Sequence, residues 1–252
     1  EKAYQVMMVN IPSSANIASY IKKEFEKGVP GSILLFKQNF YDTCEKSATY
    51  ISEVKSAFAS LSREKGFKGV SPLIAVDNEG GSVFRTSAIT SILPSARSMA
   101  KNLKTEEMEE LVSLVAKQMK MLGIDFNLAP VAECATKENE LLLGQRTFSA
   151  SSQITIDYAN AFIRGMNSEG ILCSIKHFPG NGGDDPHGGT SKLMCSKQEF
   201  EQLYLHTFKK IVEEKHVAIS LLLSHHLLIM VQIQVPLSIN ISSIATSALL
   251  HP

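Results

Sequence analysis

The sequence of residues 171–187 is Ile-Leu-Cys-Ser-Ile-Lys-His-Phe-Pro-Gly-Asn-Gly-Gly-Asp-Asp-Pro-His. Its first five residues are mostly apolar and predict a buried strand, which Lys176 and His177 follow directly. The remainder is a loop rich in proline and glycine that ends in Asp185 and His187. Parallel α/β proteins place functional side chains where strands end, and a carboxylate near a histidine can orient the imidazole for acid–base work. An ordinary surface turn is the alternative interpretation.

The same alternation of apolar strand and amphipathic helix recurs along the chain. Strands are expected at Gln5–Val9, Ser32–Phe36, Leu73–Val76, Asp125–Leu128, Ile171–Ile175 and Val217–Leu223. Their nearly continuous apolar composition is typical of strands buried on both faces of a parallel sheet. Because strands alternate with helices over a chain of 252 residues, we predict a single α/β domain over residues 1–252. The expected fold is a TIM-type (β/α) barrel, incomplete at the C-terminus, with six of the usual eight strand–helix units.

Three helices have recognisable ends. Thr105 is expected to cap the first, because acidic residues follow it in the opening turn and Gly123 stands after the last apolar position. A second helix is expected from Ile154 to Asn167. Ser196 and Glu199 predict a capping box at the start of a third.

Composition excludes several classes of function. Lys plus Arg and Asp plus Glu number 25 each, so there is no basic field to attract nucleic acid. The longest apolar run, Val217–Val231, is too short and too polar to span a bilayer. The four cysteines form no C-x-x-C pair, which predicts buried free thiols rather than a disulfide or metal framework. Because the chain starts at Glu1, a trimmed N-terminus leaves an exported form open beside the favoured cytoplasmic location.

Polar residues of complementary chemistry follow the expected strands. Asp77 follows the third, Arg146 lies in the loop after the fourth, and Lys176 and His177 follow the fifth. The carboxyl ends of barrel strands meet on one face, so these side chains should converge there. Charged groups that donate and accept together suit the hydroxyls of a sugar. For Arg85, a ligand contact and an ion pair with Glu79 are equally good interpretations.

A metal site is the competing interpretation of the histidines. His225 and His226 follow the sixth strand and could join His177 and His187. Adjacent residues of a strand point to opposite faces, so only one of the first two can face the barrel axis. We therefore expect neither a metal nor a cofactor, and a metal-dependent barrel hydrolase stays an alternative.

Five segments, in order along the chain, resemble successive landmarks of glycoside hydrolase family 3. They are Gly31–Phe36, Ala75–Gly81, Asn127–Val131, Arg146–Phe148 and Lys176–Gly180. The loop ending in Asp-Pro-His resembles the bacterial β-N-acetylglucosaminidase (β-N-acetylhexosaminidase) branch. The resemblance implies an N-terminal barrel domain and a retaining hydrolase acting on terminal β-linked N-acetylglucosamine, in peptidoglycan or chitin-oligosaccharide turnover. The implied partner is a small carbohydrate.

The resemblance also implies roles for individual residues. Asp77 resembles the carboxylate that grips sugar hydroxyls. Arg146, Lys176 and His177 resemble the residues that hold the other hydroxyls of the ring. His187 resembles the acid/base of the branch, with Asp185 as its partner.

The family's nucleophile lies in a Ser-Asp-Asp segment that has no match here, since Pro186–Pro252 contains no aspartate. No residue of this chain is assigned as nucleophile. A sugar-binding relic without turnover is therefore the alternative to an active glycosidase.

Overall fold

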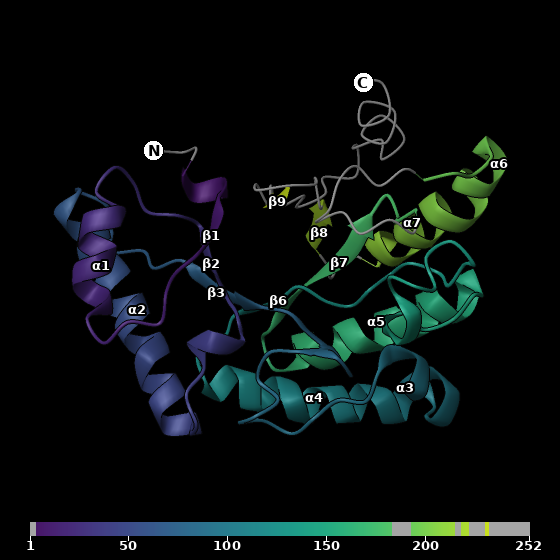
Figure 1. The fold of residues 1–252 in the computed structure, drawn as a ribbon, viewed down its shortest axis with the longest axis horizontal. Coiled ribbons are helices and arrows are strands. Elements are labelled where there is room, and N and C mark those ends of the chain that lie inside the picture. The colour runs from purple at the N-terminus through teal and green to yellow at the C-terminus, as the bar shows by residue number, and fades with distance from the viewer. Residues whose placement is uncertain (1–3, 183–192, 215–217, 222–229, 232–252) are drawn as a thin grey trace.

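The computed structural model describes residues 4–182, 193–214, 218–221 and 230–231, and Figure 1 shows their arrangement. Seven strands form one sheet in the order β1-β2-β3-β6-β7-β8-β9. Their bounds are β1 Met8–Asn10, β2 Ser32–Leu35, β3 Leu73–Val76, β6 Phe126–Asn127, β7 Leu172–Phe178, β8 Ala218–Leu221 and β9 Met230–Val231. Strands β1 to β8 in this order pair in parallel, and β9 is antiparallel to β8. The six predicted strands therefore all have a counterpart.

Helices lie along the outside of the curved sheet (Figure 1). The bounds of the α-helices are α1 Ile17–Glu24, α2 Cys44–Glu64, α3 Ala96–Asn102, α4 Thr105–Met121, α5 Ser152–Ser168, α6 Lys197–Glu199 and α7 His206–Glu213. Short helical turns are η1 Tyr4–Val6, η2 Lys37–Asn39, η3 Gly144–Arg146 and the π-helical η4 Phe200–Leu205. Each parallel strand pair is thus joined by a connection that crosses the outside of the sheet, as in a (β/α) barrel.

The strand boundaries differ most from the predicted ones in β1, β6 and β7, while β2 ends one residue early, at Leu35. Residues 4–6 form the turn η1, so β1 begins only at Met8. Strand β6 keeps two of its four predicted residues. Strand β7 continues to Phe178, because the backbone of Lys176 bonds to Pro130 and Ala132 beside it. Lys176 and His177 therefore belong to the strand, rather than following it.

The helix ends largely match the predicted ones. Helix α4 begins at Thr105, but the residue that caps it is Lys104, whose backbone N–H donates to the Glu107 carboxylate at 2.7 Å. Gly123, with a φ of 89°, follows its end as predicted. The hydroxyl of Ser196 accepts the N–H of Glu199, which confirms the start of the third predicted helix.

Helices α4 and α5 pack closely against each other at the edge of the core. Met108, Val112, Val115 and Met119 of α4 are fully buried in the core. Gly165 of α5 lets the two backbones approach, since a Cβ there would lie 2.6 Å from the carbonyl oxygen of Glu109. This close contact holds two helices that flank β6 and β7, the strands that lead into the polar cluster described below.

The cysteines are free, as predicted, but only Cys134 and Cys173 are buried; Cys195 is partly exposed and Cys44 is exposed. In the part of the chain that the structure describes, no helix has the length and apolar character needed to cross a membrane.

Candidate active site

The carboxyl end of β3 turns at once into a short hairpin of β4 (Asn78–Gly80) and β5 (Val83–Phe84). Gly80 makes this turn possible, because its φ is 102° and a Cβ there would lie 2.3 Å from the carbonyl oxygen of Pro94. Asn127 at the end of β6 fastens the hairpin: its side chain accepts the N–H of Asn78 and donates to the Asn78 carbonyl, both at 2.9 Å. Asn78, which stands between Asp77 and Glu79 in the sequence, is thereby held to the end of β6.

Lys176 joins these two carboxylates. Its Nζ lies 2.6 Å from Oδ1 of Asp77 and 2.6 Å from Oε1 of Glu79. Only 5% of its side chain is exposed. Burial alone would lower the pKa of Lys176, but the two carboxylates outweigh it and raise that pKa above its ordinary value. An ammonium has three donors, and these contacts use two of them.

Arg146, from the turn η3, binds Glu79 on its other side. Its Nε and Nη2 donate to the two carboxylate oxygens at 2.8 and 2.9 Å, which is the bidentate geometry of a strong charge pair. Burial would raise the pKa of Glu79, but Lys176 and Arg146 lower it from 4.5 to about 2. Glu79 is therefore a buried anion held between two cations.

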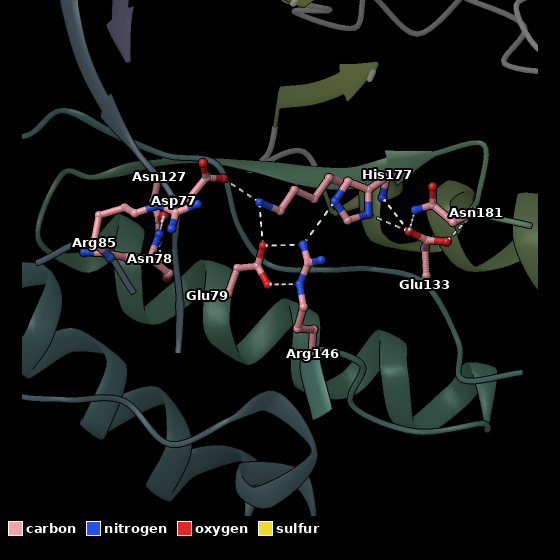
Figure 2. Close-up of polar contacts among 10 residues, drawn as sticks. Asp77, Asn78, Glu79, Arg85, Asn127, Glu133, Arg146, His177 and Asn181 are labelled. Atoms are coloured by element: carbon pink, nitrogen blue, oxygen red, sulfur yellow. Dashed lines mark hydrogen bonds and ion pairs between the residues drawn. The ribbon is translucent and has the colours of Figure 1, made fainter. Parts of the chain in front are cut away.

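His177 extends the cluster toward a third carboxylate. Its Nε2 lies 3.3 Å from Nη2 of Arg146, and its Nδ1 lies 2.6 Å from Oε1 of Glu133. Contacts run from Asp77 through Lys176, Glu79, Arg146 and His177 to Glu133 and Asn181. Figure 2 shows them, with Lys176 as the unlabelled side chain that bridges Asp77 and Glu79. Charges of opposite sign alternate from Asp77 to Arg146, and His177 then links Arg146 to the Glu133 carboxylate through its two ring nitrogens.

The structure thus brings together the four residues that the sequence analysis assigned to a sugar. Asp77, Arg146, Lys176 and His177 share one network at the carboxyl ends of β3 and β7. The exposed edges of this network belong to Asp77, Arg146 and His177, with side-chain exposures of 15, 21 and 13%. A ligand can reach these three directly, whereas Lys176 is almost covered.

The expectations for Arg85, for the pair Asp185 and His187, and for a metal site have different outcomes. The suggested pair between Arg85 and Glu79 does not form, because Lys176 and Arg146 occupy the Glu79 carboxylate; the Nε of Arg85 is buried without a hydrogen-bond partner in the described part of the chain. The proposed acid/base pair, Asp185 and His187, lies outside the described residues, as do His225 and His226. Within the described ranges no three His, Cys, Asp or Glu side chains are placed to hold a metal ion.

The sequence analysis missed Glu79 as the centre of the ion cluster and missed Glu133 altogether. Glu133 stands in the apolar stretch Leu128–Ala135, and its side chain is completely buried. A lone carboxylate in an apolar run after a strand was the available signal, because a buried charge needs dedicated partners.

Comparison with known proteins identifies the chain's relatives. Residues 1–237 match the family model described as the glycosyl hydrolase family 3 N terminal domain. The beta-hexosaminidase LpqI from Mycobacterium tuberculosis is 35% identical over 122 residues, which are 47% of this chain and 31% of that protein. A beta-hexosaminidase from Psychromonas ingrahamii is 33% identical over 173 residues, 67% of this chain and 48% of its own length. The chain spans less than half of either relative.

Solved structures show the fold. A glycoside hydrolase family 3 beta-N-acetylglucosaminidase from Paenibacillus superposes with a TM-score of 0.75 and 22% identity, covering 86% of this chain and 40% of that one. The predicted class, an α/β fold of the TIM-barrel type, is confirmed, and the described residues form six of its parallel strands.

Proposed function

The chain belongs to glycosyl hydrolase family 3, and we propose that it serves the hydrolysis of glycosides that end in β-linked N-acetylglucosamine. In this proposal residues 1–252 form one barrel domain, and the ion cluster at the ends of β3 and β7 binds the terminal sugar. The substrate class rests on the relatives, which are named beta-hexosaminidases.

One observation carries the proposal: Asp77, Arg146 and His177 present acceptors and donors side by side on the exposed edge of an otherwise buried network. A sugar hydroxyl both donates and accepts, so neighbouring hydroxyls need this mixture. The carboxylate of Asp77 and Nε2 of His177 accept from the sugar, while the guanidinium of Arg146 donates to it. Lys176 holds the Asp77 carboxylate in place from the buried side. Because the ion pairs already hold these groups in place, little side-chain entropy is lost when the sugar binds.

The chemistry of the proposal follows the retaining scheme. His187, oriented by Asp185, protonates the leaving oxygen and later activates water; both residues lie outside those described. The covalent step needs a carboxylate nucleophile, and no residue between 1 and 252 is assigned to it. Ring binding is therefore what the described residues supply.

Turnover of an aryl β-N-acetylglucosaminide tests the proposal, with the matching aryl β-glucoside as the comparison substrate. We expect the 252 residues to bind the sugar but barely cleave its aryl glycoside. In a protein that also carries the nucleophile, we expect preference for the N-acetyl substrate, and lower turnover in His187→Asn with sugar binding retained. Asp157→Asn, which changes an exposed carboxylate of α5, serves as the control. Sugar binding without any turnover in that protein would favour the relic, and absence of both would contradict the proposed function.

A further inference from the structure

Glu133 is a completely buried carboxylate whose partners lie on β7 and on the segment directly after it. Oε1 accepts from Nδ1 of His177 at 2.6 Å and from Nδ2 of Asn181 at 2.7 Å. The backbone N–H of His177 donates to the same oxygen at 3.2 Å, and the backbone N–H of Asn181 donates to Oε2 at 2.6 Å. Both carboxylate oxygens are therefore engaged, and Asn181 holds the group from the side opposite the ring.

The two neighbours of the His177 ring select one tautomer. A carboxylate offers only acceptors, so the Nδ1 that faces Glu133 carries a proton. A guanidinium offers only donors, so the Nε2 that faces Arg146 presents a lone pair. A ring protonated at both nitrogens would point an N–H at the Arg146 cation, which is unfavourable. The geometry thus specifies a neutral His177 with its proton on Nδ1.

We propose that Glu133 is a positioning residue for the sugar site: it fixes the orientation of His177 and its proton at Nδ1, and thereby keeps the Nε2 acceptor beside Arg146. The inference rests on the proposed function of the cluster: on binding, a sugar hydroxyl takes the single Nε2 lone pair that faces Arg146 in the unliganded protein, and Arg146 donates to the sugar instead. Glu133 itself is covered and makes no contact with the sugar. Its effect reaches the ligand only through His177.

A purely structural carboxylate would stabilise the turn after β7 without setting the state of the ring. Nitrogen NMR of the His177 imidazole separates the two roles, since the two neutral tautomers and the imidazolium have distinct spectra. Glu133→Gln keeps the shape but puts an amide N–H₂ among groups that are all donors. Glu133→Asp keeps the charge, and Glu138→Gln removes an exposed carboxylate from the same loop as a control.

In the unmodified chain we expect the neutral, Nδ1-protonated ring at neutral pH. Glu133→Gln should give a mixture of tautomers and raise the dissociation constant for N-acetylglucosamine about tenfold, the size of one lost hydrogen bond between the sugar and His177. Glu133→Asp should largely restore the single tautomer, and Glu138→Gln should match the unmodified chain.

An Nε2-protonated or doubly protonated ring in the unmodified chain overturns the proposal, even if Glu133→Gln fails to fold. So does a folded Glu133→Gln with an unchanged ring spectrum. If the unmodified chain binds no N-acetylglucosamine, the proposed function fails, and the ring spectra still decide whether Glu133 positions His177.

Discussion

Lys176 and Asp77 are 99 residues apart in the sequence, yet their side chains meet at 2.6 Å. Lys176 lies near the carboxyl end of β7, and Asp77 directly follows β3. Strand β6 lies between these two strands in the sheet. Two strand spacings amount to about 10 Å, and the long side chain of Lys176 spans the gap. The contact therefore joins the carboxyl ends of β3 and β7 across β6. Removing it should lower both the stability of the fold and the affinity of the cluster for a sugar.

Replacing Lys176 with methionine should destabilise the protein strongly. The variant keeps the volume of the side chain but leaves Asp77 without its cation and Glu79 with Arg146 alone. Removing one partner of a buried ion pair costs about 3–5 kcal/mol in the free energy of unfolding. Urea denaturation measures this cost, with Lys197→Met as the control, because the Lys197 side chain is 89% exposed. Equal unfolding free energies for the two variants would contradict the role of Lys176.

Glu79 should make the stability of the fold sensitive to acid. Lys176 and Arg146 lower its pKa to about 2 against burial, so the folded protein holds this proton less tightly than the unfolded chain. The stabilisation is complete above the ordinary pKa of 4.5 and is lost as the pH falls toward 2. It amounts to about 3 kcal/mol.

Urea unfolding of the unmodified chain and of Glu79→Gln at several pH values measures the effect. We expect the variant to be less stable at neutral pH and to lose less stability on acidification through this window. Glu138→Gln should follow the unmodified curve. Parallel curves for Glu79→Gln and the unmodified chain would rule out the assigned charge state.

Gly165→Ala should destabilise the contact between α4 and α5. Alanine usually gains about 1 kcal/mol over glycine inside a helix, but here its Cβ would meet the Glu109 carbonyl oxygen at 2.6 Å. Overpacking of this kind costs about 1–3 kcal/mol, so the net change should be a loss of stability. A lower melting temperature than that of the control Gln153→Ala, an exposed site on α5, is the expected result. A gain in stability would contradict this prediction, because it would show that α4 and α5 can move apart to accommodate the added methyl group at little cost.

Much of the fold could be predicted because its strands are buried on both faces. Strand β3 has the predicted bounds, since four apolar residues in a row leave little choice of structure. The hairpin of β4 and β5 was missed because Asn78-Glu79-Gly80 has no apolar pattern. It forms through Gly80 and through the bonds between Asn78 and Asn127, which are 49 residues apart. Local periodicity carries no information on such contacts.

The candidate site likewise contains residues whose role could be predicted and residues whose role could not. Asp77, Lys176 and His177 stand at strand ends, where a parallel fold gathers them, and their meeting could be predicted. The role of Glu133 could not be predicted, because it depends on partners that lie 44 and 48 residues further along the chain. The partners of Glu79 were also unpredictable: the sequence offered Arg85 only as one of two equal interpretations, and the structure places Arg146 and Lys176 there.

Calorimetric titration with N-acetylglucosamine, comparing the unmodified chain with Asp77→Asn, is the most direct measurement of sugar binding by this cluster. The substitution keeps the shape of the side chain and removes the charge-assisted acceptor at the exposed edge. We predict measurable binding to the unmodified chain and to the control Asp157→Asn, and binding at least about tenfold weaker in Asp77→Asn. Equal affinity in all three proteins, or no binding to the folded unmodified chain, would contradict the proposal that this cluster binds the sugar.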